Sequence, residues 1–493
     1  MPLLRLRQHL PQLQLPRYRI KYLGLLAIGL SIFLHAFFAW HQPFTNDEGA
    51  YLYDARTILE GKVSAGDVLT KAPVPILLFT VGEAVTHKSV FAARIVNSIA
   101  SIITVVPLFL LLQLVMNKRT AYIGAVLWLL GPGSIIFYTI GHTQAVASLF
   151  AVTCLYFFVR GFRVKSGMTS IFLAGVCFAL AYMSRKTAIA VSVPLMLSWV
   201  VLRNTKDGLW SIIKPFLLGV ISIVIPWVIW MYVLYGSSGV WHALGTGYGD
   251  IVVHSQSITP WAGSADRMFA ESVRMGLMYG ALLAVICITV LRNHRVLIDA
   301  SWVATLGILY WLWPTHLVEY LADFIPPIVL AGSVALGSLH GVRKQYILVG
   351  ILLCISAWSL HSVYIRPWTG MFARTAVEES ANFLQEHVPL AEEVFTAAVI
   401  VPYLSGHHVP FDLSHPQWYR YAFISEKDKD TFLPPYSAVE KIVDQQVSWV
   451  LRDQLTDYVY PDISFGAFQE SMRFPNNTGY RQNPLRVYSK YEY

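Results

Sequence analysis

Residues 46–51 read Asn46-Asp47-Glu48-Gly49-Ala50-Tyr51 and follow directly on an apolar segment that ends near Trp40. Ionised carboxylates are costly next to lipid, so acidic residues in such a place usually serve a function. A carboxylate at the membrane–water boundary could act as a base on a substrate that arrives through the bilayer. The pair Asp47-Glu48 therefore predicts chemistry at this boundary.

The composition is that of a membrane protein. Of the 493 residues, 55% are hydrophobic and 13% are charged, whereas soluble proteins carry about 25% charged residues. The formal net charge of +8 fits the usual excess of Lys and Arg in cytoplasmic loops. No basic cluster falls within a soluble segment, which argues against nucleic-acid binding. The four cysteines lie in apolar runs without metal-binding spacing, so they do not indicate a redox compartment.

About eleven apolar segments approach the roughly 20 residues that cross a bilayer as a helix. They lie near 21–40, 92–116, 120–138, 142–160, 169–184, 187–202, 212–235, 272–291, 297–313, 317–339 and 345–364. We expect the first to be a retained signal-anchor helix, because no cleavage site stands out after it. The sequence thus predicts a polytopic α-helical membrane protein with about 11 transmembrane helices.

Basic residues in every second loop predict the orientation. They recur near positions 118, 163, 206, 293 and 343, and they are absent from the loops near 138–142 and 314–316. The positive-inside rule then places the N-terminus in the cytoplasm, and an odd number of spans places the C-terminus outside. The two long loops, 41–91 and 236–271, are external in this topology. The first is predicted to hold a helix at Tyr51–Leu59, ended by Gly61, and a short apolar segment, Pro75–Val85, on the membrane surface.

The composition changes from about Pro367 onward, where charged residues appear regularly and long apolar runs end. An amphipathic helix is predicted at Ala373–Glu386. Buried strands are predicted at Val394–Ile400, Val447–Leu451 and Leu485–Tyr488. The sequence therefore predicts two domains: a transmembrane catalytic domain at 1–366 and an extracytoplasmic soluble α/β domain at 367–493.

Two groups of side chains are candidates for acid–base and anion chemistry. Partial burial of Asp47 or Glu48 would raise the pKa of the carboxyl toward working pH, as a general base requires; the alternative is a solvated loop or helix cap. Lys71, Arg185 and Lys186 could bind phosphate, Arg185 through a bidentate contact. For Lys71, snorkelling to the membrane interface is the alternative. Arg185 and Lys186 fall in a short external hairpin, against the positive-inside rule, so the alternatives for them are an error in the topology or anchoring to lipid.

A third group lies at the mouth of the tenth predicted span, where His316, Glu319 and Tyr320 form a polar patch together with Asp323. In an α-helix His316 and Glu319 share a face, as do Glu319 and Asp323. Helix capping with an internal pair is the alternative to a substrate or metal role. The spacing does not diagnose a metal.

The order of these motifs resembles the membrane glycosyltransferases of the C superfamily (GT-C), above all the branch with protein O-mannosyltransferases and the lipid A aminoarabinose transferase. The match rests on residues 46–51 after one span, Lys71-Ala72-Pro73 about two dozen residues later, Ala93-Arg94-Ile95-Val96 opening the second span, and Tyr320 to Pro327 in a late span. Gly49-Ala50 lacks the arginine of some lipid A enzymes, which argues against that acceptor.

The resemblance implies an inverting, mannosyltransferase-like enzyme of the cell membrane. It would move one hexose or pentose from dolichyl or undecaprenyl monophosphate to a hydroxyl on a glycan, lipid or protein at the external face. Asp47 would be the base, and Glu48 would orient Asp47 or contact the sugar or a metal. The implied donor-phosphate ligands are Lys71, Arg185 and Lys186, and the implied substrate contacts are Tyr51, Arg94, His316, Glu319 and Tyr320.

A divalent metal ion is one option for a cofactor, with unknown ligands. Two rival functions remain at this stage. An oligosaccharide ligase or polymerase would use a diphosphate-linked donor and would also need external basic residues. A transporter of lipid-linked glycans would be expected to show repeat symmetry and polar residues at the membrane midplane, and the sequence shows neither.

Overall fold

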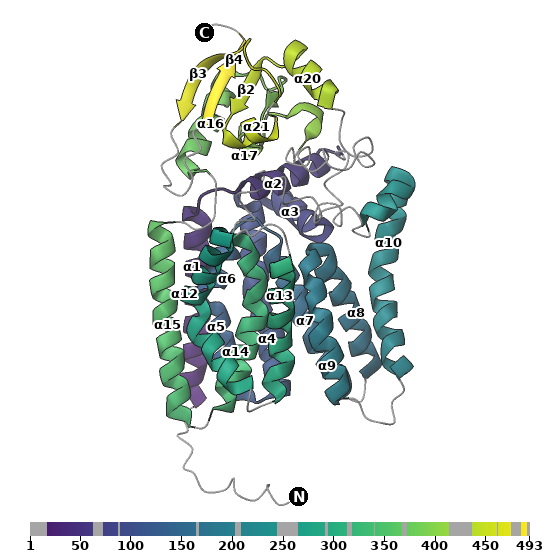
Figure 1. The fold of residues 1–493 in the computed structure, drawn as a ribbon, viewed down its shortest axis with the longest axis vertical. Helices are drawn as coiled ribbons and strands as arrows, with labels where there is room; N and C mark the ends of the chain where they lie inside the picture. Colours follow the sequence, from purple (N-terminus) through teal and green to yellow (C-terminus); the bar gives the residue numbers. More distant parts are fainter. Residues whose placement is uncertain are drawn as a thin grey trace, which may run out of the picture.

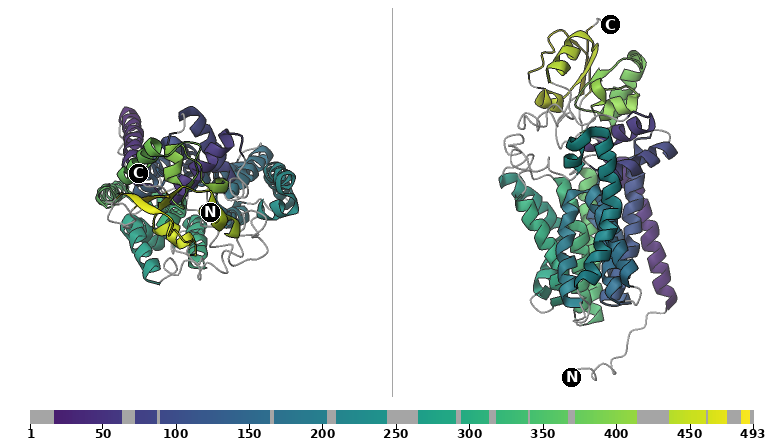
Figure 2. Two further views of the ribbon diagram at one scale, coloured as in Figure 1. Left: turned by 90° about the horizontal axis from the view of Figure 1, so that it is seen from above. Right: turned by 90° about the vertical axis from the view of Figure 1, so that its right-hand side faces the viewer.

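The computed structural model describes residues 17–62, 72–86, 89–163, 167–202, 209–243, 265–290, 294–312, 318–339, 341–366, 372–413, 436–460, 462–474 and 485–490. They form a bundle of long helices with a smaller α/β unit at one end (Figure 1). Helices α2 (Asn46–Leu59) and α3 (Pro73–Thr86) lie between the bundle and this unit. Figure 2 shows the same order of layers from the side.

Eight described helices are long and apolar enough to cross a membrane. They are α1 (Arg17–His41), α4 (Phe91–Val115), α7 (Gln144–Arg163), α8 (Gly167–Ser184), α10 (Leu209–Ala243), α12 (Ala265–Val290), α14 (Ile325–Ser338) with the preceding 3-10 helix η2 (Val318–Phe324), and α15 (Val342–Ile365). Shorter apolar helices are α3, α9 (Ser192–Leu202) with the 3-10 helix η1 (Lys186–Val191), and α13 (His294–Leu312). The predicted class is confirmed, but the predicted count of eleven spans is not.

Some predicted spans are broken, for identifiable reasons. The segment 120–138 divides into α5 (Lys118–Leu129) and α6 (Pro132–Phe137), because Pro132 lacks an N–H and starts a new helix after Gly131. The predicted external loop 236–271 begins inside α10, which bends at Gly236 (φ 62°) and continues to Ala243. Its last part belongs to α12, which begins at Ala265.

Small residues let the helices of the bundle approach closely. A Cβ on Gly175 of α8 would lie 2.0 Å from the carbonyl oxygen of Phe216, and one on Gly219 of α10 would lie 2.1 Å from that of Phe172. Membrane helices associate through such contacts, since lipid offers little hydrophobic drive to bring them together. Large apolar side chains on α1, α10 and α15 remain exposed, as expected of surfaces that face lipid.

The C-terminal unit holds a four-stranded sheet in the order β1-β2-β4-β3. Its strands are β1 (Val394–Phe395), β2 (Trp449–Arg452), β3 (Gln469–Phe474) and β4 (Leu485–Ser489). Strands β1 and β2 pair in parallel, whereas β2–β4 and β3–β4 pair antiparallel. The described helices of the unit are α16 (Arg374–His387), α17 (Ile400–Ser405), α20 (Tyr436–Gln445) and α21 (Gln454–Val459), with the 3-10 turn η3 (Pro410–Asp412).

The helix predicted at Ala373–Glu386 and the strand predicted at Leu485–Tyr488 are confirmed within a residue or two by α16 and β4. The strand predicted at Val394–Ile400 is wrong beyond Phe395. The backbone N–H groups of Ala397 and Ala398 donate to the hydroxyls of Thr456 and Thr396 instead of to a neighbouring strand. The chain therefore leaves the sheet and enters α17 at Ile400.

The C-terminal unit is held against α2 and α3 by buried contacts. Arg56 of α2 donates to the backbone oxygens of Tyr403 (3.1 Å) and His407 (2.6 Å). The Tyr403 hydroxyl also donates to Glu83 of α3. Side chains of α2, α3, α16, α17 and the sheet belong to one hydrophobic cluster. The helices α2 and α3 and the C-terminal unit therefore share one hydrophobic core across the domain boundary predicted near residue 367.

Candidate functional site

The polar segment 46–51 forms the first turns of α2. Thr45 caps the helix: its hydroxyl accepts a hydrogen bond from the backbone N–H of Glu48 at 3.1 Å. Asp47 and Glu48 occupy the first turn, where carboxylates interact favourably with the helix dipole. Neighbouring residues in a helix point in different directions, so the two carboxylates have different surroundings. Asp47 is partly exposed, whereas Glu48 is fully buried.

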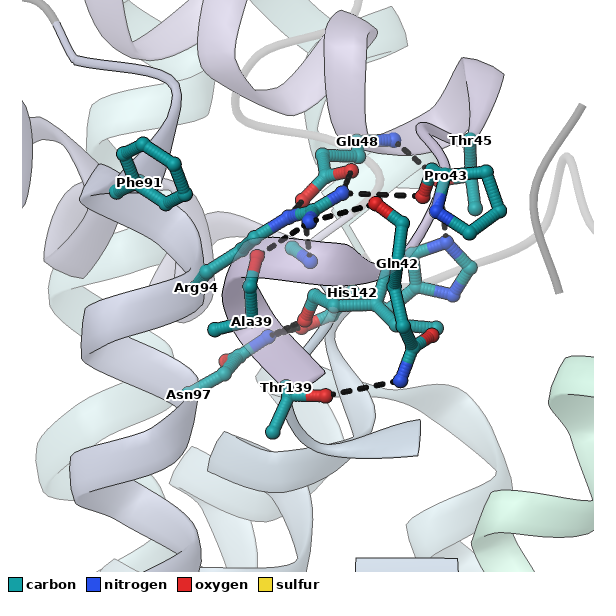
Figure 3. A network of polar contacts seen from close by, with 12 residues as sticks. Ala39, Gln42, Pro43, Thr45, Glu48, Phe91, Arg94, Asn97, Thr139 and His142 are labelled. Atoms are coloured by element: carbon teal, nitrogen blue, oxygen red, sulfur yellow. Dashed lines mark hydrogen bonds and ion pairs between the residues drawn. The ribbon is translucent and has the colours of Figure 1, made fainter. Parts of the chain in front are cut away.

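Glu48 is bound by the guanidinium of Arg94 from α4 (Figure 3). Arg94 Nε donates to Oε1 at 2.6 Å, and Nη2 donates to Oε2 at 2.7 Å. The backbone N–H of Gly141 donates to Oε1 at 2.9 Å. Both side chains have no exposed surface. We expected Arg94 to contact substrate and Glu48 to contact Asp47, sugar or metal; in the structure, the two residues bind each other inside the protein.

The remaining donors of Arg94 fix the end of α1. Nη1 donates to the carbonyl oxygens of Ala39 (2.6 Å) and Gln42 (3.1 Å), and Nη2 donates to that of Pro43 (3.1 Å). The guanidinium also lies 4.8 Å from the ring centroid of Phe44. One arginine thus connects the end of α1, the start of α2 and the body of α4.

Further hydrogen bonds hold the connection between α6 and α7 against α4 and the start of α2. Asn97 donates to the carbonyl oxygens of Ile140 (2.5 Å) and His142 (2.6 Å). His142 Nε2 and the hydroxyl of Thr45 are joined at 2.7 Å. Residues 140–143 therefore have a defined position beside the first turn of α2 (Figure 3).

A second ion pair joins the end of α8 to the 3-10 helix η2. Arg185, at the junction of α8 and η1, has its Nε 2.7 Å from Oδ1 and 2.8 Å from Oδ2 of Asp323 in η2. Thr187 donates to Asp323 Oδ2 at 3.0 Å. The guanidinium lies 5.3 Å from the ring centroid of Tyr320. Its Nη1 is 3.5 Å from the hydroxyl of Thr143, next to His142.

Electrostatics link this ion pair to α2. Burial lowers the pKa of the Arg185 guanidinium, but Asp323 raises it by more, and Tyr320 and Tyr51 add smaller contributions in the same direction. Arg185 therefore remains charged. Tyr51 is one helical turn after Asp47, so the two share a face of α2. The face that carries Asp47 and Tyr51 is thus in the electrostatic neighbourhood of Arg185.

The other predicted site residues have different positions. Lys186 is partly buried, and its Nζ lies 4.3 Å from the ring centroid of Tyr182. Glu319 falls in the 3-10 helix η2, where residues three apart share a face. The α-helical face predicted for Glu319 and Asp323, four residues apart, is therefore not formed. Lys71 and His316 lie outside the described residues. Among the residues that the structure describes, no group of three or more His, Cys, Asp or Glu side chains could hold a metal ion.

Sequence reasoning missed the pairings rather than the residues. Asp323 appeared as a member of a polar patch, without the connection to Arg185. Asn97 and Thr187 had no signal, since an amide or hydroxyl in an apolar helix is common and is often satisfied locally.

Comparisons with known proteins agree with this architecture. Residues 70–230 match the family described as dolichyl-phosphate-mannose-protein mannosyltransferase. No curated protein sequence matches the chain. The crystal structure of ArnT from Cupriavidus metallidurans bound to undecaprenyl phosphate is similar over 95% of this chain and 97% of that chain, with a TM-score of 0.65 and 13% identity. The apo state of ArnT gives the same score and identity, over 95% and 98%.

A more distant likeness is to the apo form of the Archaeoglobus fulgidus oligosaccharyltransferase, with a TM-score of 0.51 and 12% identity over 89% of this chain and 70% of that chain. At these identities the likenesses show the fold. The predicted resemblance to the GT-C superfamily and the predicted fold, a helical membrane bundle with a small C-terminal sheet, are confirmed.

Proposed function

We propose that the chain is an inverting membrane glycosyltransferase that moves one sugar from a polyprenyl monophosphate to an acceptor hydroxyl. One observation carries the proposal: Arg185 reaches Thr143, and the neighbouring His142 is joined to Thr45, which caps the turn of α2 that carries Asp47. This place lies at the end of the bundle that the C-terminal unit covers. The GT-C fold and the family match over residues 70–230 support it. This end is external in the proposed topology, with the N-terminus cytoplasmic.

The proposed reaction is a single displacement. Asp47 accepts the proton of the acceptor hydroxyl, whose oxygen bonds to the anomeric carbon. The bond from that carbon to the phosphate oxygen breaks on the opposite face, which inverts the configuration. The leaving polyprenyl phosphate gains the electron pair, and Arg185 and Lys186 stabilise its charge. Asp47 then passes its proton to water. Lys71 remains a proposed further phosphate ligand.

Glu48 and Arg94 have a different role in this proposal. Their oxygen and nitrogen atoms already bind each other and the backbone at 2.6–3.1 Å, and neither is exposed. A buried, fully hydrogen-bonded pair is well suited to hold elements in register. We assign it to fixing the first turn of α2, and so Asp47, against residues 140–143. Tyr51 and Tyr320 remain proposed substrate contacts.

The charge at Arg185 favours a monophosphate over a diphosphate donor. A sugar phosphate linked to a polyprenol is a phosphodiester with one negative charge, and the diphosphate has two. Arg185 and Lys186 contribute two positive charges, and Asp323 removes one. The proposed base Asp47 and the proposed ligand Lys71 carry opposite charges that cancel, so the net charge of the proposed site is +1 and matches the phosphodiester. Mannose, as in the matched family, and other hexoses or pentoses are the candidate sugars.

A transfer assay tests the proposal. The purified chain in lipid nanodiscs is incubated with radiolabelled mannosyl- or arabinosyl-phosphoundecaprenol, or with the same sugar on undecaprenyl diphosphate, together with a crude envelope acceptor fraction. Release of undecaprenyl phosphate and labelled product only with the monophosphate is expected, and Asp47→Asn should slow both by roughly 10²–10⁴-fold. Turnover of only the diphosphate donor would instead establish the ligase reaction.

A further inference from the structure

The ion pair between Arg185 and Asp323 leaves part of the arginine available. Asp323 engages Nε, at 2.7 and 2.8 Å from its two oxygens. Nη1 has one long contact, 3.5 Å, to the Thr143 hydroxyl. Within the described part of the chain, no hydrogen bond from Nη2 is found, and 17% of the side chain is exposed. The guanidinium is thus held at one edge and retains donors for an anion.

We propose that Asp323 is a positioning residue that acts through Arg185, orienting its guanidinium toward the phosphate of the lipid substrate. This inference rests on the proposed function and extends it by a residue that does not itself touch substrate. An arginine recognises phosphate through two parallel N–H groups in one plane, so the orientation of that plane decides the strength of the contact.

The surroundings of Asp323 suit this role. Thr187, two residues after Arg185, donates to Oδ2 of Asp323 at 3.0 Å. The segment that carries Arg185 therefore also holds the Asp323 carboxylate in place. Only 11% of the Asp323 side chain is exposed. The ring of Tyr320, 5.3 Å from the guanidinium, adds a further restraint through a cation–π contact. Asp323 and Tyr320 of η2 therefore restrain the guanidinium, and Thr187 of η1 restrains Asp323.

A purely electrostatic role and a positioning role for Asp323 predict opposite effects of neutralising its carboxylate on lipid-phosphate binding. If Asp323 acted only as a negative charge near an anion site, its neutralisation would strengthen lipid-phosphate binding. If it orients Arg185, neutralisation weakens binding, because the guanidinium must be ordered again at each binding event. The sign of the change decides between the two.

The experiment measures binding of undecaprenyl phosphate alone to the full-length protein in nanodiscs, by quenching of tryptophan fluorescence. Asp323→Asn should weaken binding by about tenfold, the range of coupled contacts. Because Asp323 acts through Arg185, the double variant Arg185→Ala/Asp323→Asn should bind as weakly as Arg185→Ala, within about twofold. Arg119→Ala is the matched control, since Arg119 contacts Val342 and Tyr346, and its affinity should equal the wild type.

Thr187→Val covers the case in which Asp323→Asn does not fold. Valine has nearly the volume of threonine but lacks the hydroxyl that donates to Asp323 Oδ2. Thr187→Val alone should weaken binding of undecaprenyl phosphate by about two- to threefold, and it should have no further effect in a protein that already carries Asp323→Asn. Tighter binding by Asp323→Asn, or independent effects of the two substitutions in the double variant, overturns the inference.

The inference and the proposed function can fail separately. A protein that transfers sugar, but whose lipid-phosphate affinity is unchanged by Asp323→Asn and Thr187→Val, refutes the positioning role and leaves the function standing. A protein that shows the expected binding cycle but transfers no sugar from the monophosphate refutes the function, and Asp323 still orients Arg185 toward a lipid phosphate.

Discussion

Arg94 donates two hydrogen bonds to Glu48, Nε to Oε1 at 2.6 Å and Nη2 to Oε2 at 2.7 Å, inside a region without exposed surface. Two unpaired charges in such a place would cost several kcal/mol each. The pair therefore joins α2 to α4, and the remaining donors of Arg94 join both to the end of α1. Asp47, one residue before Glu48, owes its position to that contact.

Asp47→Asn tests the proposed base. The substitution keeps the shape of a partly exposed side chain but replaces one carboxylate oxygen with an amide NH2, so the side chain can no longer act as a base. Turnover should fall by roughly 10²–10⁴-fold, while the melting temperature stays at the wild-type value. Steady-state transfer rates and a thermal unfolding scan on the same preparation measure both. Full activity of the Asp47→Asn variant would exclude this role.

Glu48→Gln tests the scaffold role of the buried pair. Breaking one partner leaves an uncompensated guanidinium, and stability should fall by about 3–5 kcal/mol. Activity per folded molecule should fall much less than for Asp47→Asn. The free energy of unfolding and the active-site titre of the folded fraction are the measurements. Wild-type stability with lost turnover would instead place Glu48 in the chemistry.

Gly49→Ala tests the contact between α2 and α17. A Cβ on Gly49 would lie 2.7 Å from the backbone nitrogen and 2.8 Å from the Cα of Ile400, neither of which is the end of a flexible side chain. We expect a loss of about 1–3 kcal/mol from overpacking and faster proteolysis of the C-terminal unit. Gly24→Ala, where nothing lies within 4 Å, is the matched control. Equal protease sensitivity of the two variants would refute the close contact.

Acid should loosen the C-terminal unit through Asp412. Burial raises the pKa of this carboxyl, but hydrogen bonds from His408 and Tyr53 outweigh it, so the pKa is lowered below its ordinary value of 3.8. A lowered folded pKa gives stability that is present above pH 3.8 and is lost as pH falls through the lowered value.

The matched variant for this effect is Asp412→Asn. Asn tolerates the left-handed backbone at this position (φ 52°) as Asp does. The wild type should be more stable than the variant at pH 7, and the difference should shrink below pH 3.8. Unfolding curves from pH 2 to 7 measure it; a difference that stays constant with pH would contradict the assignment.

The proposed topology is tested by labelling single cysteines. The alternation of basic loops predicts that positions near 118, 163, 206, 293 and 343 face the cytoplasm, and that Gly61 and the exposed Leu390 face outside. An impermeant maleimide should modify the second set in intact cells and the first only after lysis. Labelling of position 61 only after lysis would reverse the orientation and the external site with it.

Much of the architecture is readable because hydropathy and periodicity are local properties. The apolar spans, the helix predicted at Tyr51–Leu59, the short apolar helix α3 and the helix α16 follow from the residues that compose them, although α2 begins five residues before the predicted start, at Asn46. Boundaries failed where a local feature competed with hydropathy, as at Pro132, or where threonine hydroxyls took the place of a strand partner, as at Ala397 and Ala398.

By itself, the sequence determined that this is a polytopic membrane protein, that an acidic segment and a helix follow the first span, and that a small α/β unit follows the last one. That the helix already begins at Asn46, and not at Tyr51, was decided by the structure. Only the tertiary structure decided the partners of the protein's charges. Glu48 meets Arg94 from 46 residues away, and Arg185 meets Asp323 from 138 residues away. Such pairings depend on which helices lie side by side, and helix adjacency is set by the packing of whole surfaces, which no local window of sequence contains.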